Sequence, residues 1–445
     1  MTNSLPAAWL GRTTASAVLL AGLVSSLEAA TIQVGPSRTY TTPSLAKPHV
    51  NNGDTVEIDA ATYIGDFTTW TQHNLIIRGV GGRPHLNANG APSNGKATWV
   101  IQGTNTTVEN IEFSGARLAV DKNGAGIRQE GAGLTIRYCY FHDNDDGILT
   151  DAGAACDILI EYSEFANNGY GDGYSHNMYI GNIRSFTLRF CYSHHAYIGH
   201  LVKSRANANY ILYNRLMDES TGQASREIDL PQGGLSYVIG NLIQQGNAAQ
   251  NSGLVGYALE NQNNATQQLY VAHNTMVNER TAGATFVSVA GPSPTAWIVN
   301  NLFVGNGTTL SGIGTLTNNL TWTLAQSTQL VDCAGYDYRL KAGSAAIDKG
   351  VTPGVFNSYN LTPAYQYVHP AGNEARPVEL ALDIGAYECP DTDGDGMEDN
   401  WERTYFGSLT NVLGAPAIDW DGDTVNNLGE YLAGTVPTNR TSYLH

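Results

Sequence analysis

Basic residues are scarce in this chain of 445 residues: 23 lysines and arginines stand against 40 aspartates and glutamates, a formal net charge of −17. A nucleic-acid-binding protein needs a basic face to neutralise phosphates, so the charge argues against such a partner. Charged residues of both signs make up only 14% of the chain, whereas glycine (49) and tyrosine (24) are frequent. This composition is typical of a β-rich protein with many tight turns.

Paired cysteines are also missing. The five cysteines are odd in number and form no CxxC motif, so the sequence has neither a disulfide framework nor a zinc-finger pattern. They are Cys139, Cys156, Cys191, Cys333 and Cys389. We expect them to be buried as small apolar side chains.

Long apolar runs are absent apart from one near the start. Residues 15–24 are apolar but too few to span a bilayer. Arg12 precedes this run and small residues follow it near Ala30, so residues 1–30 have the pattern of a secretory signal peptide. The sequence therefore predicts an exported bacterial protein, secreted or held at the cell surface, that is not an integral membrane protein.

Short strands of alternating apolar residues recur from about residue 100. Four of them end in asparagine, at Asn214, Asn241, Asn274 and Asn301, with intervals of 27, 33 and 27 residues. Repeats built only from short strands and turns predict an all-β solenoid, here over residues 31–388. Asparagine at a repeated bend can hydrogen-bond the backbone of the neighbouring coil. Cys139, Ser163 and Cys191 occupy equivalent positions in earlier repeats, which supports their burial.

Residues 389–445 predict a separate calcium-binding module, and residues 391–445 carry a net charge of −8. Two stretches match the twelve-residue calcium loop, with oxygen ligands at positions 1, 3, 5 and 12. The predicted ligands are Asp391, Asp393, Asp395 and Glu402 in the first loop and Asp419, Asp421, Asp423 and Glu430 in the second. The second loop has Thr424 where glycine is usual. The module resembles the dockerin-like and thrombospondin-type-3-like tails of exported bacterial proteins, which implies a structural Ca²⁺ or surface attachment.

Residues 197–234 are the most informative stretch for chemistry, because three β-like pieces there carry basic residues. Lys203 and Arg205 are two apart and so share one face of a strand. Arg226 follows Lys203 by 23 residues, close to one coil, which predicts that the two lie side by side. A base and an acid placed in this way suit β-elimination of a uronate, in which the proton on C5 is removed.

This stretch resembles polysaccharide lyase family 6, the alginate lyase and chondroitinase B group, a family of right-handed parallel β-helices. The matching residues are Lys203-Ser204, Asn209, Asn214, Arg226, Gly233-Gly234 and residues 238–241. The resemblance implies that Lys203 is the base and Arg226 the acid. It covers about 45 residues and departs from the family in one respect. No carboxylate stands just before Lys203 to hold a catalytic calcium. His200, Arg205 or another cation would then neutralise the substrate carboxylate.

Histidines and a tyrosine extend the predicted site. An offset of 24 residues places His176 over His200 and Tyr179 over Lys203, so we expect one patch with Arg226. Tyr179 and His200 are further catalytic candidates, and the predicted substrate-binding residues are His176, His195, Arg205 and Glu227. If the strand is regular from Ser225, Glu227 and Asp229 face outward and Arg226 does not. A bulge or turn at Arg226 would let the Arg226 side chain face outward instead.

The function predicted from the sequence is a secreted, monomeric lyase acting on an anionic, uronate-containing polysaccharide. Three alternatives stay open. A uronate C5-epimerase shares the proton abstraction. A glycoside hydrolase would use paired carboxylates among Asp143, Asp145, Asp146 and Asp151, of which the first three lie in a turn-forming stretch. A non-catalytic glycan-binding β-helix would lack a convergence of lysine, arginine and histidine in a groove.

Overall fold

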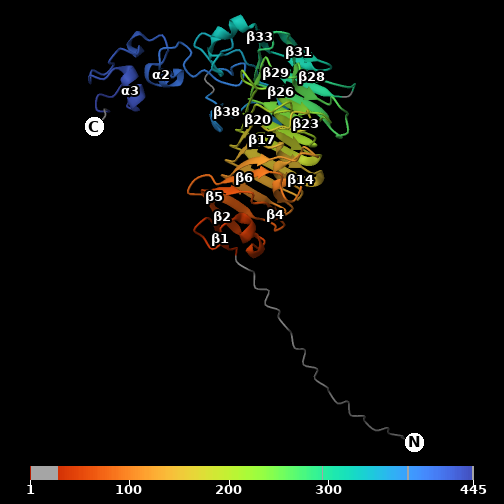
Figure 1. Cartoon of the computed structure of the whole chain (residues 1–445). Coiled ribbons are helices and arrows are strands. Elements are labelled where there is room, and N and C mark those ends of the chain that lie inside the picture. The colour runs from red at the N-terminus through yellow and green to blue at the C-terminus, as the bar shows by residue number, and fades with distance from the viewer. Residues whose placement is uncertain (2–28, 293, 378–379, 443–445) are drawn as a thin grey trace.

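The computed structural model describes residues 1, 29–292, 294–377 and 380–442. The predicted signal peptide therefore lies almost entirely outside the described residues. From Thr31 onward the chain winds into a rod of stacked coils, and each coil gives one strand in turn to three parallel sheets (Figure 1). The predicted all-β solenoid is confirmed as a parallel β-helix.

Sheet A has twelve strands: β1 (Thr31–Val34), β2 (Thr55–Asp59), β5 (Ile76–Val80), β8 (Thr106–Glu109), β11 (Leu134–Arg137), β14 (Gly153–Glu161), β17 (Ile183–Arg189), β20 (Ala208–Leu212), β23 (Gly234–Ile239), β26 (Gln267–Ala272), β29 (Thr295–Val299) and β32 (Thr315–Thr317). Sheet B has eleven: β3 (Thr62–Ile64), β6 (His85–Gly90), β9 (Glu112–Ala116), β12 (Tyr140–His142), β15 (Glu164–Ala166), β18 (Tyr192–His194), β21 (Arg215–Met217), β24 (Leu242–Gln245), β27 (Thr275–Asn278), β30 (Leu302–Val304) and β33 (Leu320–Trp322). Sheet C has ten: β4 (Thr68–Trp70), β7 (Ala97–Ile101), β10 (Ala125–Gln129), β13 (Asp146–Thr150), β16 (Met178–Ile180), β19 (Val202–Ser204), β22 (Ile228–Leu230), β25 (Gly253–Tyr257), β28 (Ala284–Val289) and β31 (Gly307–Ser311).

The core is a stack of like side chains, because alternate residues of each strand point inward and meet their equivalents in the next coil. The rings of Phe113, Phe141 and Phe165 are fully buried and stack with centroid distances of 5.0 and 4.9 Å. The remaining residues of each strand point outward, so outward residues from successive coils lie side by side in rows, some of which other segments cover. That geometry is what assembles the candidate site on sheet C.

The predicted asparagine ladder is confirmed. The Oδ1 atom of Asn241 accepts a hydrogen bond from the backbone N–H of Asn214 at 2.9 Å, and Asn241 donates its own N–H to Asn274 Oδ1 at 2.9 Å. The ladder runs on through Asn301 to Asn319. Toward the N-terminus, Cys191, Ser163 and Cys139 occupy the equivalent positions, as predicted. The backbone N–H of Cys191 donates to Asn214 Oδ1, and that of Cys139 donates to Ser163 Oγ. All five cysteines are free, and four of them are buried.

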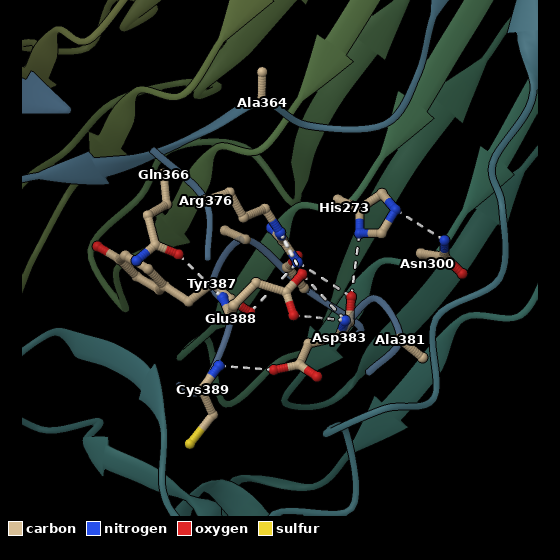
Figure 2. Close-up of polar contacts among 12 residues, drawn as sticks. His273, Asn300, Ala364, Gln366, Arg376, Ala381, Asp383, Tyr387, Glu388 and Cys389 are labelled. Atoms are coloured by element: carbon tan, nitrogen blue, oxygen red, sulfur yellow. Dashed lines mark hydrogen bonds and ion pairs between the residues drawn. The ribbon is translucent and has the colours of Figure 1, made fainter. Parts of the chain in front are cut away.

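Short elements close both ends of the solenoid. The helices α1 (Pro43–Ala46) and η1 (Lys47–His49) lie at the N-terminal end, and the C-terminal end is built from η2 (Leu324–Gln329), β34 (Leu330–Asp332), β35 (Asp337–Leu340), β36 (Val355–Phe356), β37 (Tyr359–Asn360), β38 (Tyr365–Val368) and β39 (Gly372–Ala375). Figure 2 shows how the closing segment is fastened. A buried ion pair joins Arg376 Nε to Glu388 Oε1 at 2.5 Å, and His273, the residue after β26, contacts the backbone oxygen of Asp383 at 3.2 Å. This cluster is sealed from solvent and is therefore structural.

The tail contains α2 (Asp399–Phe406), η3 (Val412–Gly414) and α3 (Asn427–Ala433). α2 and α3 each begin within one of the two acidic loops. Among the described residues, no helix has both the length and the apolar character needed to cross a membrane.

Candidate active site

The candidate site lies on the outward face of sheet C. Tyr179 of β16 pairs in register with Lys203 of β19, which in turn pairs with Asp229 of β22. The predicted placement of Tyr179 beside Lys203 is confirmed. In parallel strands such partners are about 4.8 Å apart, so three functional side chains from three coils form one row. Asp229 joins this row as the sequence parity predicted.

Two carboxylates surround the Lys203 ammonium. Its Nζ atom lies 3.3 Å from Glu260 Oε1 and 3.7 Å from Asp229 Oδ2. Glu260 also binds Arg205, whose guanidinium lies 2.7 Å from Glu260 Oε2. Arg205 donates a further hydrogen bond from Nε to the hydroxyl of Tyr179 at 2.7 Å. Lys203 and Arg205 thus hold one exposed carboxylate, that of Glu260, between them.

A groove of about 550 Å³ opens over this row. Its lining mixes cations, carboxylates and rings: Asp121, Lys122, Asn123, Arg128, Asp146, Leu149, Asp172, Tyr174, His176, Tyr179, Lys203, Arg205 and Glu260. Four of these residues are lysine or arginine. Four others are aspartate or glutamate, so the lining has a formal net charge of zero in a chain whose formal net charge is −17. The groove is therefore less acidic than the chain as a whole, which favours an anionic ligand there over the rest of the surface.

Arg226 does not pair in register with Lys203, whose partner is Asp229; it lies beside Asp229 at the end of the row and is not among the residues that line the groove. Its NH1 atom is 3.8 Å from Asp229 Oδ1, the other oxygen of the carboxylate that faces Lys203. The side chains of Arg226 and Lys203 are 21% and 11% exposed, so neither is sealed inside the stack. Arg226 precedes β22 in a bend rather than in the strand, which is why it points outward despite its strand parity.

His176 and His200 form a buried stack behind the groove. Their rings are 4.9 Å apart, and His176 Nδ1 accepts the backbone N–H of His200 at 3.0 Å. His200 Nε2 lies 3.5 Å from Asp229 Oδ2. Burial lowers the pKa of both imidazoles well below the ordinary value, with the nearby cations adding to the effect. A lowered pKa favours the neutral form of both rings at pH 7, which does not suit His200 to the predicted role of a cation.

Asp229 is the residue on which these groups converge. Burial raises its pKa, against the opposing charges of Lys203 and Arg226. Glu260 behaves differently. Partial burial acts to raise its pKa, but the hydrogen bond from Arg205 and the charges of Lys203 and Arg205 outweigh it and lower the pKa. Glu260 is therefore a charged, partly exposed anion resting on two cations.

Two predicted substrate-binding residues lie elsewhere. Glu227 is fully buried beneath the bend before β22 and is not available to a substrate, so that prediction is wrong. His195 contacts His194 and Thr221 in a separate surface hollow outside the Lys203 groove. Of the other two, Arg205 lines the groove, whereas His176 lies at its wall but is fully buried and so is not available to a substrate either.

The carboxylates proposed for a hydrolase are mostly structural. Asp145 is fully buried and accepts the backbone N–H groups of Leu118 and Gly124. Asp151 pairs with Arg128 at the groove edge. Asp146 lines the groove but accepts the backbone N–H of His176 at 2.7 Å.

We expect the Glu227→Gln variant to be more stable than the wild type at neutral pH. Burial raises the pKa of Glu227 well above its ordinary value, and neighbouring Asp218 adds to the effect. The folded state then keeps a proton that the unfolded state releases above about pH 4, so stability falls as pH rises from there. The penalty grows by about 1.4 kcal/mol for each pH unit over which Glu227 keeps its proton, and an uncharged amide does not incur it.

Urea unfolding at pH 4 and pH 7 measures this effect. The two proteins should differ little at pH 4 and by up to about 3 kcal/mol at pH 7. Glu109→Gln, at a partly exposed glutamate, is the control and should follow the wild type. If the free energy of unfolding changed equally from pH 4 to pH 7 in wild type and Glu227→Gln, Glu227 would be charged in the folded protein.

The tail loops bring their carboxylates together as a calcium site requires. Oxygens of Asp393, Asp395 and Glu402 lie within 4.8 Å of one another, and so do those of Asp419, Asp421 and Asp423. Glu402 and Glu430 each have a buried carboxylate oxygen with no hydrogen-bond partner among the described residues. Thr424 adopts φ 88°, the conformation that glycine usually provides at this loop position. The donor set fits Ca²⁺, a hard cation that prefers oxygen ligands.

No family model matches the sequence, and comparison with curated proteins gives no match. Among solved structures, the chain is similar to pectate lyase Pel9A, with a TM-score of 0.59 and 14% identity over 82% of this chain and 97% of that one. An alginate lyase from Paenibacillus sp. strain FPU-7 gives a TM-score of 0.38 and 13% identity, covering 66% of this chain and 99% of that one. The first likeness establishes the fold, and membership of polysaccharide lyase family 6 stays a prediction.

Proposed function

We propose that the protein is a polysaccharide lyase that cleaves an anionic, uronate-containing polysaccharide by β-elimination in the sheet C groove. The observation that carries this proposal is the carboxylate of Glu260, held at 3.3 Å by Lys203 and at 2.7 Å by Arg205. A uronate brings an equivalent carboxylate to Arg205, which places its sugar ring beside Lys203. The similarity to a structure described as a pectate lyase is consistent with this substrate class.

In the proposed reaction the sugar carboxylate displaces Glu260 and pairs with Arg205. Neutralising that carboxylate makes the C5 proton easier to remove, because negative charge develops there in the transition state. As the base, Lys203 releases a proton to solvent and takes the C5 proton in its place; the electron pair forms the C4–C5 double bond, and the C4–O4 bond breaks. Arg226 supplies the proton to the leaving oxygen, and solvent returns it. Tyr179, fixed by Arg205 and by its stack on His176, orients the sugar beside Lys203.

A panel of polysaccharides tests the function. The protein is incubated with alginate, pectate, chondroitin and glucuronan, and the ultraviolet absorbance of the unsaturated product is followed. Absorbance that rises with one of them supports the proposal and identifies the sugar. New reducing ends without absorbance indicate hydrolysis, deuterium uptake at C5 without cleavage indicates an epimerase, and binding alone indicates a glycan-binding protein.

The Glu260→Gln variant should bind the substrate more tightly. Its side chain is 44% exposed, so its ion pairs contribute little to folding, but the carboxylate competes with the substrate for Arg205. We expect KM to fall by about three- to tenfold with kcat nearly unchanged. Steady-state kinetics measure this, with Glu279→Gln, outside the groove lining, as the control. A large loss of kcat would instead place Glu260 in the catalytic machinery.

We propose in addition that the tail binds two Ca²⁺ ions and that the protein is exported, with the tail serving stability or surface attachment. A chelator should lower the helical circular dichroism signal of α2 and α3 while activity at low temperature is kept. Asp393→Ala and Asp421→Ala should each reduce bound calcium from two ions to one. Loss of activity at low temperature in parallel with chelation would place a required ion in the groove.

A further inference from the structure

A second cluster of polar side chains lies on the outward face of sheet B, on three successive coils. His85 of β6 pairs in register with Glu112 of β9, and His142 of β12 lies across from Ser114, two residues beyond Glu112. Glu112 Oε1 is 3.5 Å from His85 Nε2 and 3.0 Å from His142 Nε2. The cluster is remote from the sheet C groove, whose lining contains none of these residues.

These distances suit a small divalent cation. In a tetrahedral zinc site with bonds of about 2.0–2.1 Å, neighbouring ligand atoms are separated by about 3.3 Å. The two measured separations, 3.5 and 3.0 Å, bracket that value, and all three ligand atoms lie within 4.8 Å of one another. The side chains are 17–25% exposed, so an ion can reach them from solvent.

The hydrogen bonds around His142 point to a cation as well. Its Nδ1 atom lies 2.7 Å from Asp143 Oδ2, and its Nε2 atom faces Glu112. A neutral imidazole has one N–H, so it can donate to only one of the two carboxylates. When it donates to Asp143, the Nε2 lone pair and the Glu112 oxygen face each other, an arrangement that is resolved either by a bound cation or by a second proton on the imidazole. A histidine ligand oriented by a carboxylate on its other nitrogen is a common arrangement in metal sites.

We propose that His85, Glu112 and His142 bind one Zn²⁺ ion on sheet B, with Asp143 orienting His142. Two imidazoles and one carboxylate are ligands that zinc accepts, and three protein ligands leave one coordination position open to water. The ion links β6, β9 and β12, three successive coils of the solenoid. The tail loops offer oxygen ligands only and suit Ca²⁺ instead.

The chain carries its own control for this site, two coils further on. His194 Nε2 lies 3.2 Å from Glu164 Oε1, as His142 lies beside Glu112. Tyr192 stacks on His194 at 4.1 Å, as Tyr140 stacks on His142 at 4.4 Å. In the preceding coil, however, the residue in register with Glu164 is Tyr140, whereas the residue in register with Glu112 is His85. The second pair therefore lacks the third ligand.

The experiment uses the untagged full chain saturated with Ca²⁺ and measures Zn²⁺ binding by competition with a chromophoric chelator. We expect one Zn²⁺ per chain. Glu112→Gln and His142→Ala should each weaken binding more than 100-fold, and Asp143→Asn by about 10- to 100-fold. His194→Ala should bind as the wild type does. Co²⁺ in place of Zn²⁺ should give a visible absorption spectrum that His142→Ala abolishes.

Thermal unfolding checks that the variants fold. Without zinc, all of them should unfold near the wild-type Tm, and Zn²⁺ should raise the Tm of wild type and His194→Ala but not that of His142→Ala. The proposal is overturned if the wild type binds no Zn²⁺ beyond the level of Glu112→Gln, or if His194→Ala loses binding to the same extent as His142→Ala. Neither result bears on the lyase reaction, since the two sites share no residue.

Discussion

The Lys203→Ala variant should lose between about 10² and 10⁴ of the lyase kcat, the range that a positioned general base contributes. Lys203 is the lysine of the Tyr179–Lys203–Asp229 row, and its side chain is only 11% exposed. No other lysine lines the groove at this row, so no nearby amine can replace it among the described residues. Steady-state kinetics on the substrate identified by the polysaccharide panel measure the loss.

Lys122→Ala is the matched control. Lys122 also lines the groove, but it lies over the ring of Tyr170 at 4.6 Å and near Asp172 at 3.8 Å rather than beside Lys203. Its loss removes one positive charge from the groove without touching the proposed reacting centre. KM should rise several-fold with kcat preserved. Equal losses of kcat in both variants would mean that the lysines act only through groove charge and that Lys203 is not the base.

The Asn241→Ala variant should unfold more easily than wild type by about 3–5 kcal/mol. The Asn241 side chain accepts the backbone N–H of Asn214 and donates to the backbone oxygen of Ile211, both in the buried interior. Alanine leaves both groups without these partners, and each buried polar group left unpaired costs about 1–3 kcal/mol. Urea unfolding followed by circular dichroism measures the difference.

Asn263→Ala, at an exposed position, tests whether the effect belongs to the ladder rather than to asparagine as such. It should change the free energy of unfolding by less than about 0.5 kcal/mol. If Asn241→Ala were as mild as Asn263→Ala, the ladder would contribute little to stability, and stacking of apolar side chains alone would hold neighbouring coils together.

The fold could be predicted from the sequence because short alternating strands recur coil after coil, although in-register partners are from 18 residues apart (Trp297 and Thr315) to 33 (Ser236 and Leu269). The same recurrence allowed the pairing of Tyr179 with Lys203 to be predicted from a 24-residue offset. Strand parity holds only inside a strand, however. Arg226 and Glu227 lie in the bend before β22, so their orientations are opposite to those of a regular strand that starts at Ser225.

Two features of the sites could not be predicted from the repeat intervals of the sequence. Glu260 lies in the loop after β25 and reaches back to Lys203, 57 positions earlier in the chain, a contact that no repeat interval encodes. His85, Glu112 and His142 come from three coils, and β6 carries a register irregularity between Asn87 and Gly90. His85 and His142 also occupy different positions within their strands, so no fixed offset aligns them. Sequence intervals alone do not bring these residues together.

The most direct test of the account is to count two kinds of chain end in one digest. Elimination forms one unsaturated sugar, seen by its ultraviolet absorbance, for every new reducing end. The account predicts a ratio of one throughout the reaction with the wild type, and with Lys203→Ala an increase in both ends that is at least about 100-fold slower. Reducing ends that accumulate without matching absorbance, or cleavage by Lys203→Ala at the wild-type rate, would contradict it.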